Sequence, residues 1–151
     1  MKTTVFIGKA EVKWKAKKNP VEHKIRSSRD AYNLLKAHIG KKIFEQELFL
    51  TMYMNKANKV LWIETITQGC GASCSVDIPA ITRRAIEGTA HAVIVAHNHP
   101  SGNKNPSEND KRVTKNLKKA IKPFNIEVLD HIIVCDDGYY SFADNGERSL
   151  A

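Results

Sequence analysis

The sequence predicts a single α/β or α+β domain in which a mixed β-sheet is flanked by helices. Stretches with the two-residue period of strands alternate along the chain with stretches that carry an apolar helical stripe. The length of 151 residues fits one domain, and 42% hydrophobic residues are enough to form one core. Periodicity does not give the order of the strands.

The first 26 residues differ from the rest of the chain in charge. They contain eight Lys and Arg against two acids, which accounts for +6 of the net charge of +8. Residues 10–17 (AEVKWKAK) alternate between small or apolar and charged side chains, a pattern typical of a half-buried strand. We therefore expect a basic N-terminal strand segment over 1–26, followed by the main domain over 27–145.

A helix and a hairpin are expected next. Ser27 or Ser28 can cap the helix, and Gly40 ends it. Two stretches rich in apolar, β-branched and aromatic residues, 47–54 and 60–67, are separated by a polar five-residue turn and predict the hairpin. The apolar stripe of the helix consists of Ala31, Leu34, Leu35 and His38.

The second half of the chain alternates helices and strands. A continuous apolar run indicates a strand buried on both faces, Pro123 stops a helix, and Asp136-Asp137-Gly138 is a hairpin turn. The expected elements are a short helix from Asp77 to Gly88, a strand over 91–96, a helix over 108–122, and strands over 125–135 and 139–142.

Several protein classes are excluded or disfavoured. No run reaches the roughly 18 to 20 apolar residues of a membrane span, and the apolar stretch near the start is too short for a signal peptide, so we expect a cytoplasmic protein. The three cysteines, Cys70, Cys74 and Cys135, are an odd number and are expected to be reduced. Cys70 and Cys74 lack a second thiol pair, so small packing side chains are favoured over a metal site.

The most informative stretch is His97-Asn98-His99-Pro100-Ser101-Gly102, where the buried strand runs into a loop. Side chains at positions i and i+2 of a strand point to the same side, so both imidazoles can converge on one metal ion. Asp110, in the first turn of the next helix, is the natural third ligand. Two His and one carboxylate leave one tetrahedral position open, as in catalytic zinc sites.

Asp110 also has a purely structural interpretation. Ser107 can cap the helix that starts at Glu108, and an acid in the first turn is favoured by the helix dipole. The metal hypothesis therefore depends on the combination of both histidines, the open Gly/Ser/Pro loop and the acid.

The spacing His97-x-His99-x7-Ser107-x2-Asp110 is similar to the JAMM/MPN+ motif of JAB-domain metalloproteases. The run HNHPSGNKNPSEND, followed by VLDHII at 128–133, resembles the RadC branch, and the resemblance extends from about Ser27 to Phe142. It implies a JAB/MPN fold of the cytidine-deaminase-like type around Zn²⁺. It further implies that His97, His99 and Asp110 are the zinc ligands and that Ser107 helps to hold the oxyanion or the surroundings of the reacting water.

The resemblance also implies an upstream glutamate that acts as general acid and base, because the attacking water must lose a proton and the leaving amine must gain one. Glu47 matches this position, and Glu45, with the same strand parity, is the second candidate. Without the resemblance, Glu47 would be interpreted as an exposed acid at a strand edge.

The function implied is that of a zinc-dependent hydrolase that cleaves a peptide or isopeptide-like amide. A DNA-associated role is the alternative, motivated by the net charge, by the RadC resemblance and by a basic face on the helix over 108–122. However, full-length RadC proteins carry a helix-hairpin-helix region, and nothing in residues 1–26 resembles one. A fold that has lost its activity is a third candidate, which the intact ligand set disfavours.

The sequence gives weaker predictions for the other histidines. His131 follows Asp130 and is either a support for the site or a core residue, with neither favoured. His23, His38 and His91 belong to no constellation and are expected to be structural or exposed. The deaminase pattern H-x-E with P-C-x-x-C is absent, so a related fold does not imply deamination.

Overall fold

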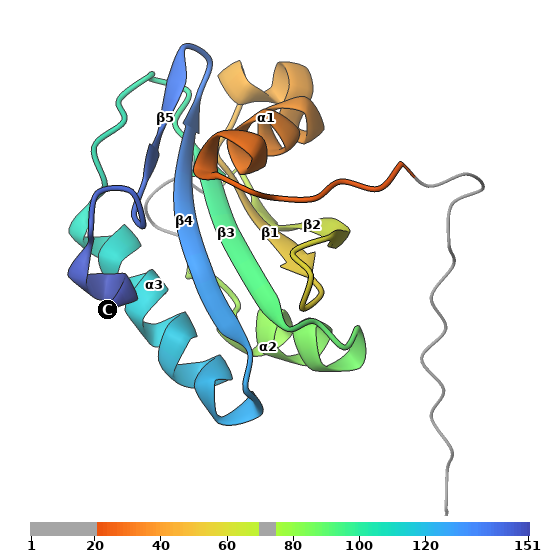
Figure 1. Ribbon diagram of the computed structural model, residues 1–151. Helices are drawn as coiled ribbons and strands as arrows, with labels where there is room; N and C mark the ends of the chain where they lie inside the picture. The colour runs from red at the N-terminus through yellow and green to blue at the C-terminus, as the bar shows by residue number, and fades with distance from the viewer. Residues whose placement is uncertain (1–20, 70–74) are drawn as a thin grey trace, which may run out of the picture.

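A computed structural model describes residues 21–69 and 75–151 (Figure 1). The strand expected over 10–17, together with Cys70 and Cys74, lies outside the described residues. The helices are α1 (Ser28–Ile39), α2 (Ile78–Glu87) and α3 (Glu108–Ile121), and the short 3₁₀ helices are η1 (Gly40–Phe44), η3 (Lys122–Phe124) and η4 (Arg148–Leu150). The strands are β1 (Leu48–Met54), β2 (Val60–Gln68), β3 (Ala92–Asn98), β4 (Glu127–Cys135) and β5 (Gly138–Ser141).

The five strands form one mixed sheet in the order β2-β1-β3-β4-β5. Only β3 and β4 run parallel, because the crossover through α3 joins them, while the other neighbouring pairs are antiparallel. The predicted mixed sheet flanked by helices is confirmed. No helix in the described part of the chain is long and apolar enough to cross a membrane.

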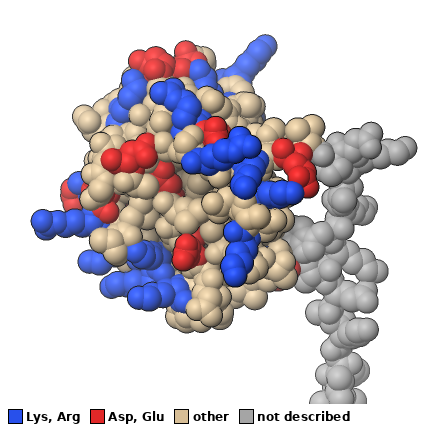
Figure 2. Space-filling view, in the orientation of Figure 1, with Lys and Arg blue, Asp and Glu red and all other residues tan. Residues whose placement is uncertain are grey.

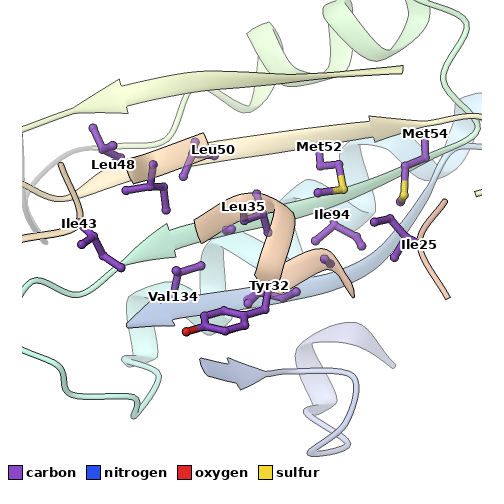
Figure 3. Close-up of a cluster of buried hydrophobic side chains, with 14 of the residues drawn as sticks. Ile25, Tyr32, Leu35, Ile43, Leu48, Leu50, Met52, Met54, Ile94 and Val134 are labelled. Atoms are coloured by element: carbon purple, nitrogen blue, oxygen red, sulfur yellow. The ribbon is translucent and has the colours of Figure 1, made fainter. Parts of the chain in front are cut away.

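Helix α1 covers one face of the sheet, as Figure 3 shows for its core residues. Alternate residues of β1 point to this face, and Leu35 of α1 packs among them with no exposed surface. The labelled side chains that share this layer include Leu48, Leu50, Met52, Met54, Ile94 and Val134.

Helices α2 and α3 cover the opposite face. Val93 and Val95 of β3 pack there with Ile81 of α2 and with Leu117 and Ile121 of α3. His97 follows the same strand parity, so it leaves the sheet on the face that α3 covers. The three-layer arrangement thus places the end of β3 beside the N-terminus of α3.

Two details of the predicted helices are wrong. His38 is exposed and Ile39 is buried in its place, because the apolar side of α1 is formed by Ala31, Tyr32, Leu35 and Ile39. In α3, Thr114 is fully buried although the apolar stripe expected from the sequence, Val113, Leu117, Ala120 and Ile121, does not include it. The N-cap of α1 is Ser27, whose side chain accepts a hydrogen bond from the backbone N–H of Asp30.

Replacing Gly88 with Ala is expected to destabilise the domain. Gly88 ends α2 with φ −86°, which any residue can adopt, so the cost is steric. A Cβ at this position would lie 1.9 Å from the Trp62 ring, which stacks on Tyr53 with ring centroids 4.3 Å apart. We expect a loss of about 1–3 kcal/mol in the free energy of unfolding, measured with urea. The loss should shrink in a Trp62→Leu background, and an equal loss in both backgrounds would contradict the steric explanation.

Candidate metal centre

The two histidines of the predicted motif meet at the end of β3. His97 lies within the strand and is 2% exposed, whereas His99 follows the last strand residue. Their Nε2 atoms are 2.9 Å apart. The sequence prediction that both imidazoles converge on one point is therefore confirmed.

The environment of His99 determines which of its nitrogens is free. Its Nδ1 contacts the carbonyl oxygen of Asn103. A carbonyl only accepts, so Nδ1 carries the hydrogen and the Nε2 of the neutral ring presents a lone pair toward His97. Histidines that bind a metal usually donate their other ring N–H to an acceptor such as this carbonyl.

A carboxylate completes the cluster. Glu47, which immediately precedes β1 and is half-buried, offers an oxygen within 4.8 Å of the ligand nitrogens of His97 and His99. A tetrahedral zinc ion with bonds of 2.0–2.1 Å keeps its nitrogen ligands about 3.3 Å apart, close to the observed separation of the two Nε2 atoms. These three side chains can hold a metal ion.

Asp110 caps helix α3 and also lies beside His97. Its Oδ2 accepts from the backbone N–H of Ser107 at 2.7 Å, while its Oδ1 lies 3.4 Å from His97 Nε2. Burial alone would raise the pKa of Asp110, but the neighbouring His97 ring and the hydrogen bonds from Ser107 pull this pKa below its ordinary value. One oxygen therefore caps α3 and the other faces His97. That Asp110 is a metal ligand stays a prediction.

Ser107 is the N-cap of α3, and its Oγ accepts from the backbone N–H of Asp110 at 3.1 Å. This bond uses a lone pair and leaves the hydroxyl hydrogen available to donate. Glu45 is exposed and lies at the end of η1 outside the strand, so the expectation that it shares strand parity with Glu47 is wrong. Glu47 is the glutamate that the structure brings to the histidines.

Asn98, which the sequence analysis did not single out, fixes the backbone around Glu47. Its Oδ1 accepts from the backbone N–H of Leu48 at 2.8 Å, and its Nδ2 donates to the carbonyls of Ile43 and Gln46 at 3.0 and 2.9 Å. The side chain is fully buried. The residue between the two histidines thus holds both chain neighbours of Glu47. In the sequence, a polar amide next to His97 at the end of an apolar run could have pointed to such a role.

His131 contacts the ring nitrogen of His97 that does not face His99. It is fully buried in β4, and its Nε2 lies 2.8 Å from His97 Nδ1. Burial, with a smaller effect of His97, lowers the pKa of His131 well below its ordinary value, so the ring is neutral. The carboxylate of Asp130 bonds elsewhere, to Ser141 Oγ and to the backbone N–H groups of His131 and Ala143. The His131 ring therefore contacts His97 and does not pair with the Asp130 carboxylate.

A pocket of about 390 Å³ opens beside His99. Ile43 and Phe44 form an apolar side, and Phe44 is 63% exposed. Asp136 and Asp137 form an acidic edge, where Lys36 and Lys104 pair with them at 3.0 and 2.9 Å.

Two lysines on the basic face of α3 already have partners within the chain. Lys111 lies 3.4 Å from Glu108 and 3.8 Å from Glu147, and Lys118 donates to the carbonyl of Leu150. Figure 2 shows acidic side chains interspersed with Lys and Arg on the visible face. Binding of nucleic acid to this helix stays a prediction.

Comparison with known proteins identifies the family. The model of the RadC-like JAB domain family matches residues 25–147, which include all the residues of the centre. The chain belongs to the RadC-like JAB domain family. Its domain therefore has the JAB/MPN type of α/β fold, in agreement with the observed sheet and helices.

The RadC-like domain is similar to several bacterial proteins. It is 37% identical over 123 residues to a UPF0758 protein of Flavobacterium johnsoniae, covering 82% of this chain and 53% of that protein. A UPF0758 protein of Chlorobaculum tepidum is 38% identical, with 81% and 54% covered, and UPF0758 protein YfjY of Escherichia coli is 41% identical, with 68% and 64% covered. The chain thus spans about half the length of the first two relatives.

Proposed function

We propose that this domain is a zinc-dependent hydrolase that cleaves a peptide or isopeptide-like amide. The observation that supports this most directly is the convergence of His97 Nε2, His99 Nε2 and the Glu47 carboxylate at the end of β3. Two imidazoles with an acid and an exposed neighbouring pocket match the donor chemistry of catalytic zinc rather than that of a closed, thiolate-rich structural site.

Each residue then has a distinct role. His97 and His99 bind zinc through Nε2, and Asp110 Oδ1, which already faces His97, supplies the third ligand. Bound zinc would lower the pKa of water and polarise the substrate carbonyl. Asn98 and the backbone of 43–48 keep Glu47 at the edge of this centre.

Glu47 moves the proton. Water adds to the amide carbonyl carbon, and the Glu47 carboxylate accepts the proton that the water gives up. The same carboxyl group then donates this proton to the nitrogen as the C–N bond breaks, so that an amine and a carboxylate leave. The hydroxyl of Ser107 donates to the oxyanion that forms in between, where a positioned donor is most effective.

The test measures zinc and hydrolysis together. We expect one zinc per wild-type chain by elemental analysis and none in His97→Ala, with His91→Ala as control because His91 is exposed and immediately precedes β3. The substrates are fluorogenic peptides and isopeptides linked through lysine Nε. Hydrolysis should disappear with a chelator and return with Zn²⁺. Full zinc retention by His97→Ala would refute the ligand set, and zinc binding without any hydrolysis would favour a silent scaffold.

A further inference from the structure

A line of buried hydrogen bonds leads from His97 to helix α3. His97 Nδ1 lies 2.8 Å from His131 Nε2, and His131 Nδ1 lies 2.6 Å from Thr114 Oγ1. Thr114 Oγ1 in turn donates to the backbone carbonyl of Asp110 at 2.7 Å. Thr114 and His131 have no exposed surface. The line thus connects His97 with the helical turn that carries Asp110.

The carbonyl at the end of this line fixes its direction. A carbonyl oxygen only accepts, so the single hydroxyl hydrogen of Thr114 points to Asp110 and its Oγ1 must accept from His131 Nδ1. The neutral His131 ring then offers its Nε2 as acceptor, and His97 Nδ1 must donate. The hydrogen of His97 therefore lies on Nδ1, and its Nε2 carries a lone pair.

The surroundings of His131 keep its ring neutral. Phe142 stacks on the ring at a centroid distance of 4.6 Å, and Phe49 meets it edge-on at 5.7 Å. The nearest carboxylate in sequence, Asp130, bonds to Ser141 and to backbone N–H groups instead of to the ring. A charged ring with two N–H groups would lack compensation in this apolar contact.

We propose that Thr114 and His131 are positioning residues that hold His97 in the tautomer able to bind a metal ion through Nε2. The proposal rests on the proposed metal function of the centre. His99 is fixed in the same tautomer by the Asn103 carbonyl, so two lone pairs face each other across 2.9 Å. A cation between them relieves this repulsion. Groups that orient metal ligands in this way typically change metal affinity by about 10–100-fold.

Removing the Thr114 hydroxyl removes the acceptor that fixes the tautomer of His131 and, through His131, that of His97. Without an acceptor at Nδ1, the His131 ring can carry its hydrogen on Nε2 and donate to His97 Nδ1. The hydrogen of His97 then moves to Nε2, where it blocks the metal. Thr114→Val preserves the shape of the side chain, so its effect reports the hydrogen bond rather than packing.

The experiment compares Thr114→Val with Thr114→Ser and with Thr82→Val. Thr82 is a matched control because its hydroxyl also donates to a carbonyl one helical turn earlier, that of Ile78 at 2.9 Å, but in α2. The ¹⁵N shifts of the imidazoles in zinc-free protein, recorded above the pH range of histidine titration, report the tautomers. Competition with a chromogenic chelator gives the Zn²⁺ affinity, and thermal unfolding of the zinc-free protein reports stability.

We expect wild type, Thr114→Ser and Thr82→Val to show His97 protonated on Nδ1, and Thr114→Val to show a mixture with Nε2–H. Zinc affinity should fall about 10–100-fold in Thr114→Val alone. An unchanged His97 tautomer and an unchanged affinity in Thr114→Val would overturn the inference. Failure of the wild type to bind zinc would overturn the proposed function instead, and the tautomer measurement would still decide the role of Thr114.

Discussion

Glu47→Gln is expected to abolish amide hydrolysis while the protein keeps its zinc. Gln has the size of Glu but cannot accept a proton from water, and general acid–base catalysis typically contributes about 10²–10⁴-fold to the rate. Because Glu47 serves both as base and as acid in the proposed mechanism, we expect kcat to fall by at least about 10³-fold, with a smaller change in KM. Steady-state kinetics on the fluorogenic isopeptide, with zinc content measured on the same sample, would test this.

Glu45→Gln provides the control. Glu45 is an acid two residues earlier, but it is exposed at the end of η1 and does not belong to the cluster with the histidines. Its replacement should leave kcat and zinc content unchanged. Full turnover by a zinc-loaded Glu47→Gln protein would remove Glu47 as the base. Loss of zinc in this variant would instead assign the Glu47 carboxylate to the metal.

The sequence was sufficient for the parts of the site that follow local rules. His97 and His99 lie two positions apart at a strand end, so strand geometry alone predicted that their rings converge. Ser107 and Asp110 form the expected capping box, which is a local pattern of four consecutive residues. The helices and strands were similarly predictable, because caps, turns and apolar runs are visible without tertiary contacts.

The remaining parts depend on contacts between distant segments. Glu47 reaches the histidines because β1 pairs with β3, with Phe49 opposite His97, and periodicity does not give the strand order. The role of His131 could not be decided from its neighbour Asp130, since its ring partners come from β3 and α3. In α1, Ile39 and not the predicted His38 is buried, because the way the helix packs on the sheet decides which side is covered. The apolar pattern of the helix alone does not specify this packing.

Asn98→Ala is expected to cause the largest loss of stability among changes near the site. The variant loses three buried hydrogen bonds and leaves the N–H of Leu48 and the carbonyls of Ile43 and Gln46 without this partner. One unpaired buried polar group typically costs about 1–3 kcal/mol. Because water can reach the turn before β1 once the side chain is removed, we expect a total loss of about 3 kcal/mol rather than the full sum. Urea unfolding of the zinc-free protein, with Asn116→Ala on the exposed side of α3 as control, measures it.

The same substitution should reduce turnover in protein that remains folded. The segment on either side of Glu47 is held to β3 by Asn98, and a displacement of about 1 Å at a catalytic group can lower the rate about 10²-fold. Asn98→Asp keeps the acceptor for the backbone N–H of Leu48 but replaces the donor to Ile43 and Gln46 with an acceptor, so it tests the contact on the Gln46 side of Glu47. Its zinc content should stay near one per chain, since His97 and His99 are held by other groups. A wild-type kcat in folded Asn98→Ala protein would show that Glu47 does not need the hydrogen bonds of Asn98. A lower kcat with zinc retained would show that Asn98, the residue between the two histidines, positions the base.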